Sequence, residues 1–293
     1  MRKINIIALT LSCLAAQMMN AQTPQLWGMT QTGGAFGNGT IYKINADGTG
    51  ADSAYYFGCP NIADSGSHPH NDLCLASDGK LYGMTYDGGL YNKGVIFSFD
   101  VATNIYTKLF DFDGISGANP PGKLVQADNG KLYGMTSAGG SINSGVLFSF
   151  DITANNYSDL YEFTTVSYLN SPNIRGSLIK ASNGLLYGLT SNDGSAHYGA
   201  LFMVDPSTGI LTYMNYLASY IYGPYASLMQ ASDGKLYFTT VFGNGGTVSS
   251  YNITTNIVYD LHNGNYQSMS NLVQINNGYY MDLVKKNIYK DIH

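Results

Sequence analysis

Charged residues are scarce in this sequence. Asp, Glu, Lys and Arg make up 11% of the 293 residues, whereas an average soluble domain has about 25%. The 14 basic and 19 acidic residues give a formal net charge of −5, so the chain lacks the basic field that binds a phosphate backbone. The excess of Ala, Glu, Lys, Leu and Arg that is typical of coiled coils and long helical bundles is also absent. We therefore expect neither a nucleic-acid partner nor a helical protein.

Long apolar runs are absent too, apart from one at the amino terminus. Ile4–Ala16 is a mostly apolar run of 13 residues that follows Met1-Arg2-Lys3, and it is shorter than the ~20 residues that span a bilayer as a helix. The pattern is typical of a signal peptide over residues 1–21, cleaved after Ala21. It predicts an exported protein, secreted or at the cell surface, with no transmembrane segment in the mature chain.

Cysteine is rare, with three in the whole chain. Removal of the signal leaves Cys59 and Cys74 in a compartment where disulfides form. Their sequence separation of 15 would make a disulfide worth about 3 kcal/mol in the chain-entropy model. Cys74, inside Leu73-Cys74-Leu75, fits a buried small hydrophobic residue equally well. The two interpretations stay open.

Glycine and aromatic residues are abundant, with 35 Gly, 25 Tyr and 12 Phe, and they recur in one phrase. The phrase reads LWGMTQTGG at 26, LYGMTYDGG at 81, LYGMTSAGG at 132, LYGLTSNDG at 186 and LYFTTVFGNGG at 236. Its spacings of 55, 51, 54 and 50 residues indicate a repeat architecture. A weaker sixth copy begins at Asn277. We expect one domain over residues 22–293, with repeats that start near 25, 71, 121, 175, 225 and 270.

Each repeat divides into four short apolar runs, which are typical of small antiparallel strands. In the third repeat these runs are Lys123–Ala127, Lys131–Thr136, Gly145–Asp151 and Tyr157–Phe163. Four strands per repeat predict a propeller blade. The fold class is therefore all-β, a β-propeller of four-stranded antiparallel blades. We expect six blades, in a range of five to seven, with a first blade that lacks its first strand and an incomplete last blade. A five-bladed ring closed by the terminal strand and a fragment of a larger ring remain alternatives.

Two kinds of connection follow from the turn residues. Asp78-Gly79 and Asn129-Gly130 join the first and second strands, and such pairs accept a positive φ at both central residues of a tight hairpin. The segments that start at Asp100 and Asp205 join the third and fourth strands, with the Asp bonding backbone amides. The two remaining connections are longer. Because strands of a blade alternate in direction, both long loops lie on one face of the disc, where we expect a functional site.

The repeat resembles a known family. The pattern is G-x-L-Y-G-x-T-x-x-G-G-x-x-x-x-G-x-[VI]-F, present as Gly79–Thr85 with Gly88, Gly89, Gly94, Ile96 and Phe97. It is similar to the GloVer tandem repeat of exported bacterial proteins and recurs from Leu26 to Asn263. The resemblance implies a secreted β-propeller-like protein without an established enzymatic activity, often with a carboxy-terminal anchor or sorting domain. The segment MDLVKKNIYKDIH after Tyr280 shows no such domain that we recognise.

Two motifs carry metal-binding residue types. His68-Pro69-His70, followed by Asp72, has two imidazoles and a carboxylate that could hold a divalent cation. The repeat alignment, however, places His68 on Asn119 and His70 on Pro121, which indicates ordinary loop positions. Asp111-Phe112-Asp113-Gly114 begins like a calcium loop, but it lacks the downstream acidic ligands, which favours a plain turn. We expect no metal site and no cofactor.

The long-loop face carries aromatic and amide residues that suit sugars or extended peptides. The positions we select as candidates for ligand binding are Tyr86, Tyr91, Tyr198 and Phe242. No His neighbours a Ser or Cys nucleophile in a catalytic motif, so we expect a non-enzymatic binding or scaffold module for a glycan or protein ligand. A polysaccharide-active enzyme that uses loop residues and an adhesin-like spacer are the alternatives.

Overall fold

The computed structural model describes most of the chain after the signal segment. The described residues are 24–58, 65–164, 174–191, 199–217, 221–222, 224, 227–240, 242–243, 247–263, 272–275, 279–282 and 287–290. The expected signal peptide and Cys59 lie outside these residues, so the export signal and the disulfide stay predictions. In the described part, no helix has the length and apolar character needed to cross a membrane.

The described residues form seven antiparallel sheets, and six of them are blades that follow one another in chain order. Blade 1 contains β1 (Gln25–Thr30), β2 (Thr40–Asn45) and β3 (Asp52–Tyr56). Blade 2 contains β4 (Cys74–Leu75), β5 (Leu81–Met84), β6 (Val95–Asp100) and β7 (Ile105–Asp111). Blade 3 contains β8 (Val125–Gln126), β9 (Leu132–Met135), β10 (Val146–Asp151) and β11 (Asn156–Glu162). Blade 4 contains β12 (Ile179–Lys180), β13 (Leu186–Thr190), β14 (Ala200–Asp205) and β15 (Ile210–Tyr216).

The last two blades complete the series. Blade 5 contains β17 (Met229–Gln230), β18 (Leu236–Thr239), β20 (Thr247–Asn252) and β21 (Ile257–Asn263). Blade 6 contains β22 (Leu272–Ile275), β23 (Tyr279–Asp282) and β24 (Asn287–Lys290). Two short strands outside the blades, β16 (Ile221–Tyr222) and β19 (Phe242–Gly243), pair with each other.

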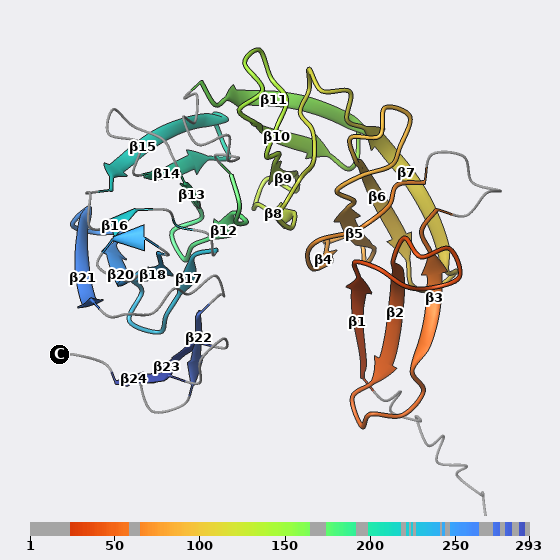
Figure 1. Ribbon diagram of the computed structural model, residues 1–293, viewed down its shortest axis with the longest axis horizontal. Coiled ribbons are helices and arrows are strands. Elements are labelled where there is room, and N and C mark those ends of the chain that lie inside the picture. Colours follow the sequence, from red (N-terminus) through yellow and green to blue (C-terminus); the bar gives the residue numbers. More distant parts are fainter. Residues whose placement is uncertain are drawn as a thin grey trace, which may run out of the picture.

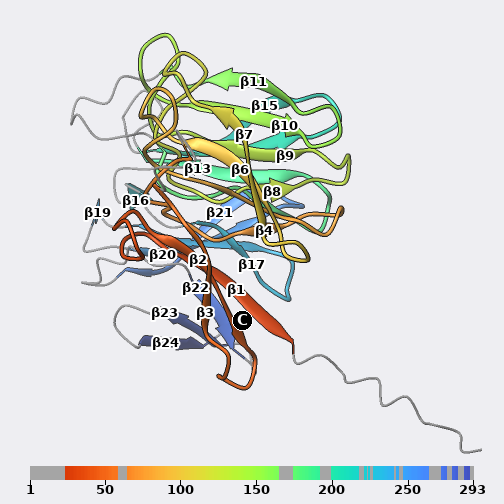
Figure 2. The same ribbon diagram turned by 90° about the vertical axis from the view of Figure 1, so that its right-hand side faces the viewer.

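The predicted propeller architecture is confirmed. Four four-stranded sheets lie between two three-stranded terminal sheets in the described part of the chain. Figure 1 shows the blades following one another around an arc, with the first strand of each complete blade on the inside and the fourth on the outside. Figure 2 shows the disc from its side. Among the described residues blade 1 has three strands, which fits the expectation of an incomplete first blade, and the last three strands form a sheet of their own, separate from β1–β3.

The hydrophobic core lies between the blades. Five clusters of buried side chains are present in the described residues, and each joins two neighbouring blades. Between blades 2 and 3, for example, Ile96 and Phe112 pack with Phe148 and Phe150, and all four are at most 1% exposed. Burial of this apolar surface against the next sheet provides the main favourable free energy of stacking.

The turns between the first and second strands differ from the prediction. Gly79 and Gly130 have φ of 81°, but Asp78 and Asn129 are not among the described residues with positive φ. Gly79 N–H donates to Ala76 O and Ala76 N–H to Lys80 O, which is a type I turn followed by a left-handed glycine. The expectation of positive φ at both residues was therefore wrong.

The side chain of the Asx residue explains why this turn is preferred. Asp78 Oδ1 accepts from Lys80 N–H, and its Oδ2 accepts from the hydroxyl of Tyr82 at 2.9 Å. Asn129 and Tyr133 make the corresponding bond at 2.9 Å. The tyrosine of each LYG phrase thus buries its ring between blades and fixes the turn with its hydroxyl. The turns after β6 and β14 are as predicted, because Asp100 and Asp205 accept backbone N–H groups and Asn104 and Gly209 have positive φ.

The glycine of each LYG phrase makes room for a ring on the next strand. A Cβ at Gly134 would lie 2.5 Å from the ring of Phe148, its partner across the β9–β10 pair. Blade 5 has the reverse arrangement, since Phe238 of β18 is opposite Ser249 of β20. Each of these strand pairs therefore has one phenylalanine ring at this position, but in blade 5 the ring comes from the second strand and not from the third.

This exchange predicts coupling between the two positions of blade 5. Phe238→Gly should lower the free energy of unfolding by about 4 kcal/mol, because it leaves a cavity, and Ser249→Phe by about 1–3 kcal/mol through overpacking. The double variant restores the Gly–Phe pair of blades 2 to 4, so it should recover about 1–3 kcal/mol relative to additivity. Chemical denaturation of the four proteins measures this coupling. Additive effects would contradict it.

A glutamine on the first strand links neighbouring blades at the inner side of the disc. Gln126 of blade 3 accepts from Ser77 N–H at 2.8 Å and donates to Ser77 Oγ at 3.0 Å. Its amide also donates to Gly130 O at 2.8 Å. Gln230 and Gln274 bond Ser182 and Ser232 in the same way. In blade 2 this position is Leu75, which is 68% exposed.

The stability that Gln126 contributes can be compared with that of Leu75, the residue at the equivalent position of blade 2. Gln126→Ala should lower the free energy of unfolding by about 1–2 kcal/mol, because it removes three hydrogen bonds and leaves Ser77 N–H without its partner. Leu75→Ala at the equivalent position of blade 2 should change it by less than about 0.5 kcal/mol, since that side chain is mostly exposed. Urea denaturation followed by tyrosine fluorescence measures both. Equal decreases in the free energy of unfolding for the two variants would show that the hydrogen bonds of Gln126 add no stability.

Candidate functional site

The two long loops of blade 2 are joined to each other, and so are those of blade 3. Isolated β-bridges connect Ser67 with Asp87 and Ala118 with Ala138. In blade 3 a Cβ at Gly139, where φ is 87°, would lie 2.4 Å from Gly117 Cα. Only glycine permits this approach with this backbone conformation. The glycine pairs therefore build the long-loop face by close backbone contact.

The first histidine of the candidate metal motif has a structural place in this arrangement. His68 and Asn119 have φ of 52° and 54°, so the alignment of these two residues is correct. Each reaches the preceding blade through its N–H, which donates to Asn38 O and Lys93 O respectively. His68 Nδ1 lies 3.3 Å from Asp87 Oδ2. The described residues hold no group of three or more His, Cys, Asp or Glu side chains that could bind a metal ion.

The structure describes the side chains of two of the four aromatic residues predicted to bind a ligand. Tyr86 is half-buried and stacks on His70, with ring centroids 4.2 Å apart. Tyr198 lies outside the described residues. Phe242 belongs to β19 opposite Tyr222, and the structure describes only its backbone. Tyr91 is 52% exposed and lines an open cleft.

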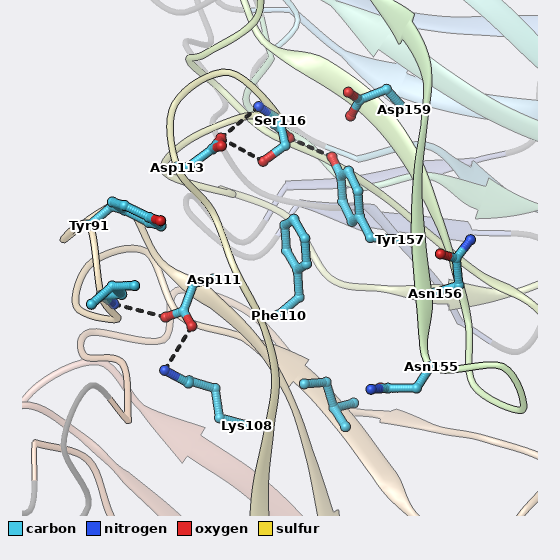
Figure 3. A pocket seen from close by; sticks show the side chains of 12 residues that line it. Tyr91, Lys108, Phe110, Asp111, Asp113, Ser116, Asn155, Asn156, Tyr157 and Asp159 are labelled. Atoms are coloured by element: carbon cyan, nitrogen blue, oxygen red, sulfur yellow. Dashed lines mark hydrogen bonds and ion pairs between the residues drawn. The ribbon is translucent and has the colours of Figure 1, made fainter.

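This cleft lies between the outer strands of blades 2 and 3 and has a volume of about 690 Å³. Figure 3 shows it with the side chains that line it. They are Leu90, Tyr91, Lys108, Leu109, Phe110, Asp111, Asp113, Ser116, Asn155, Asn156, Tyr157 and Asp159. They come from the loop after β5, from β7, from the loop between blades 2 and 3, and from the start of β11. The cleft is therefore at the outer end of a blade interface.

Two stacked rings hold the two blades together at the cleft. Phe110 of β7 and Tyr157 of β11 are nearly parallel, with ring centroids 4.0 Å apart and planes inclined by 4°. The Tyr157 hydroxyl donates to Ser116 O at 2.5 Å. Burial raises the pKa of Tyr157 far above its ordinary value, and the negative charges of Asp159 and Asp113 add to this effect. The hydroxyl is therefore a fixed donor, unsuited to acid–base chemistry.

Asp111 is held by its own blade. Its Oδ1 accepts from Leu90 N–H at 2.8 Å, and its Oδ2 pairs with Lys108 Nζ at 2.7 Å. Glu162 accepts from Ser141 N–H at 2.7 Å at the equivalent place in blade 3, and these bonds with Ser141 lower the pKa of Glu162. In blades 2 and 3 the acidic residue at the end of the fourth strand thus holds the loop that follows the glycine pair, through the N–H of Leu90 or Ser141.

Asp113 closes a local turn. Its Oδ1 accepts at 2.8 Å from Ile115 N–H, Ser116 N–H and Ser116 Oγ–H. Burial raises the pKa of Asp113, but the bonds from Ser116 and Ile115 outweigh burial, so the net pKa lies below its ordinary value. These bonds support the plain-turn interpretation of the Asp111–Gly114 motif.

The rim of the cleft combines an exposed ring with polar groups. Tyr91 lies at one side, and Asn155, Asn156 and Asp159 lie at the other (Figure 3). The charged lining residues are Asp111, Asp113, Asp159 and Lys108, a formal charge of −2. Tyr91 was predicted from the sequence, but the residues opposite it were not, because Asn155 and Asn156 resemble turn residues and Asp159 resembles a solvent-facing strand residue.

The family model described as the Gloeobacter/Verrucomicrobia repeat matches residues 14–176, more than half of the chain. This chain belongs to the Gloeobacter/Verrucomicrobia repeat family. The resemblance drawn from the LYG phrases is confirmed. No curated protein matches the sequence.

Solved structures resemble this member of the family in fold alone. TolB from Acinetobacter baumannii has a TM-score of 0.51 at 12% identity, over 90% of this chain and 62% of that one. A chain of a nidogen/laminin complex has a TM-score of 0.56 at 12% identity, over 90% and 88%. The GH74 enzyme of Niastella koreensis has a TM-score of 0.55 at 16% identity, over 81% and 36%. The chain thus spans less than two thirds of the TolB and GH74 chains.

The bonds of Asp113 predict a pH dependence. A depressed pKa in the folded state means that the carboxylate adds stability above the ordinary Asp value of about 3.9 and that this stability is lost as the pH falls through the folded pKa. Asp113→Asn should therefore destabilise the protein at pH 7, and its difference from the wild type should shrink below about pH 4. Urea denaturation across pH measures this difference. A constant difference would contradict the assignment.

Proposed function

We propose that this repeat protein is a non-enzymatic binding module outside the cytoplasm, secreted or at the bacterial surface, and that it binds a glycan in the cleft between blades 2 and 3. The proposal of export rests on the apolar run Ile4–Ala16 behind a basic start. The observation that carries the binding proposal is the exposed ring of Tyr91, which shares one open cleft with two amides and three carboxylates.

Each part of this lining suits a sugar. A flat exposed ring offers apolar area with little loss of side-chain entropy, and Asn155 and Asn156 provide both donors and acceptors. The carboxylate of Asp159 adds an acceptor for hydroxyl groups. The formal charge of −2 opposes an anionic ligand. These features favour a neutral glycan, and a protein segment is the alternative that a binding screen would reveal.

Two features support binding without catalysis. The lining residues include no His or Cys, which are common bases and nucleophiles. Asp111 and Asp113 each use a carboxylate oxygen to accept bonds from the chain itself. We therefore treat the enzymatic alternative as the less supported one, and a glycan-degradation screen would test it.

Tyr91→Ala tests the binding proposal. The full chain is first screened on glycan and peptide arrays, and the best ligand is then titrated by calorimetry. Loss of the ring should weaken binding about tenfold, which corresponds to about 1.4 kcal/mol, and the thermal midpoint should stay unchanged because Tyr91 is exposed. The matched control is Tyr259→Ala, an exposed tyrosine of β21 that does not line the cleft.

Other outcomes would change the assignment. If Tyr86→Ala, Tyr198→Ala or Phe242→Ala weakens binding and Tyr91→Ala does not, the site belongs elsewhere on the long-loop face. If neither array gives a ligand and the four aromatic variants behave like the wild type, the protein is better described as a spacer.

A further inference from the structure

The loop that follows the LYG phrase has the same backbone conformation in blades 1, 2 and 3. It begins with two glycines of positive φ, which are Gly33-Gly34, Gly88-Gly89 and Gly139-Gly140. The carbonyl oxygen of the second glycine accepts from the N–H three residues further on, and that of the first glycine accepts from the N–H six residues further on. The middle of this loop is Phe36, Tyr91 or Ile142. Because the backbone bonds are shared, these three side chains leave their loops in equivalent directions.

The residue in the middle of this loop is apolar and exposed in all three blades. Phe36 is 42% exposed, Tyr91 52% and Ile142 42%. None of the three belongs to the buried clusters of the described residues, so packing between blades does not explain their apolar character. Single exposed apolar residues are common on protein surfaces. An apolar side chain at the same exposed position of three consecutive blades is a row, which we call the loop row.

Main-chain hydrogen bonds fix the loop row from blade to blade. Asn38 O of blade 1 accepts from His68 N–H at 2.9 Å, and Lys93 O of blade 2 accepts from Asn119 N–H at 2.8 Å. The segments that contain His68 and Asn119 are bridged in turn to the loops of their own blades. The three exposed side chains therefore have a defined spacing before anything binds, which lowers the entropy cost of binding.

Ile115 connects the cleft with the loop of blade 3. Its side chain is 75% exposed. Ile115 O accepts from Gly140 N–H at 3.1 Å, so the residue lies beside the loop that carries Ile142. Asp113 and Ser116, on either side of Ile115 in the sequence, line the cleft of Tyr91 (Figure 3). Exposed apolar surface thus continues from the cleft toward the next blade.

We propose that the glycan of the cleft is a chain of several sugar units that follows the loop row, from Phe36 past Tyr91 to Ile142. This inference rests on the proposed function of the cleft. Packed sheets lie about 10 Å apart and the blades of a propeller diverge outward, so one sugar ring covers only one of these side chains. A chain of similar units offers one apolar ring face after another to a row of similar side chains.

The charge around the row favours a neutral chain. The loop segments Gly33–Gly37, Gly88–Asn92 and Gly139–Asn143 contain no charged residue, so they hold no partner for the acidic groups of an anionic polysaccharide. Contacts with separate loops that engage the same chain reinforce one another. Affinity should therefore increase with the length of the chain.

Calorimetric titration of the full chain tests the loop row with neutral oligosaccharides of glucose, xylose and mannose, from disaccharide to octasaccharide. For the sugar that binds, the dissociation constant should fall about tenfold or more from disaccharide to octasaccharide. Phe36→Ala and Ile142→Ala should each weaken octasaccharide binding about threefold or more and leave disaccharide binding unchanged, because a short chain fills only the cleft. Tyr91→Ala should weaken both. The matched controls Tyr259→Ala and Ile257→Ala, at exposed positions of β21, should change neither.

The outcomes separate this inference from the proposed function. Circular dichroism establishes that each variant is folded. A disaccharide that binds as tightly as the octasaccharide overturns the loop row and leaves the cleft in place, and so does an octasaccharide affinity that neither Phe36→Ala nor Ile142→Ala changes. A loss at one of these two positions alone supports a chain that runs to that side of Tyr91. If no oligosaccharide of any length binds, or only an arrayed peptide does, the proposed function fails and this inference fails with it.

Discussion

The structure depends on the fact that a single blade cannot bury its own apolar surface. Each buried cluster is shared by two consecutive sheets, as in the packing of Phe112 from the end of blade 2 against Phe148 of blade 3. A four-stranded sheet with two apolar faces needs a neighbour on each side, so the chain extends as an arc of stacked blades. The polar connections then collect on the two faces, and the outer strands are left as edges. The cleft between the outer strands of blades 2 and 3 is a consequence of this arrangement.

The sequence predicted those parts of the fold that repeat. Glycines with positive φ, Asx residues in turns and the LYG phrase recur at fixed spacing, and each has a local physical reason that needs no knowledge of neighbours. The turn after Asp78 was misjudged because an Asp-Gly pair fits two turn types, and only the bond from Gly79 N–H to Ala76 O distinguishes them. The exchange of Phe238 and Ser249 was missed because it compensates across a strand pair, and the register is not visible in a single repeat.

The candidate site could be predicted only in part for a similar reason. Tyr91 was predicted because an aromatic ring in a long loop suits a sugar or an extended peptide, but the cleft also needs Asn155, Asn156 and Asp159 from the outer strand and turn of the next blade. These residues lie about 65 positions further along the chain, and nothing in their local sequence marks them as facing Tyr91. The packing of blade 2 against blade 3, which includes the stacking of Phe110 on Tyr157, brings the two segments together.

The residue that follows the β-bulge on the outer strand differs from blade to blade. After the bulge, blade 2 carries Lys108, which pairs with Asp111 in the same strand. Blade 3 carries Asp159, a wall of the cleft, and blade 4 carries Tyr213, which contacts Tyr161 of blade 3. Tyr157, two residues before Asp159, is tied to the interface by its stacked ring and its bond to Ser116 O. The residue after the bulge also has partners in the structure, because Tyr213 packs against the core between blades 3 and 4 and Asp260 accepts from Ser249 Oγ–H. Variation at this position therefore changes the contacts of a blade as well as its surface.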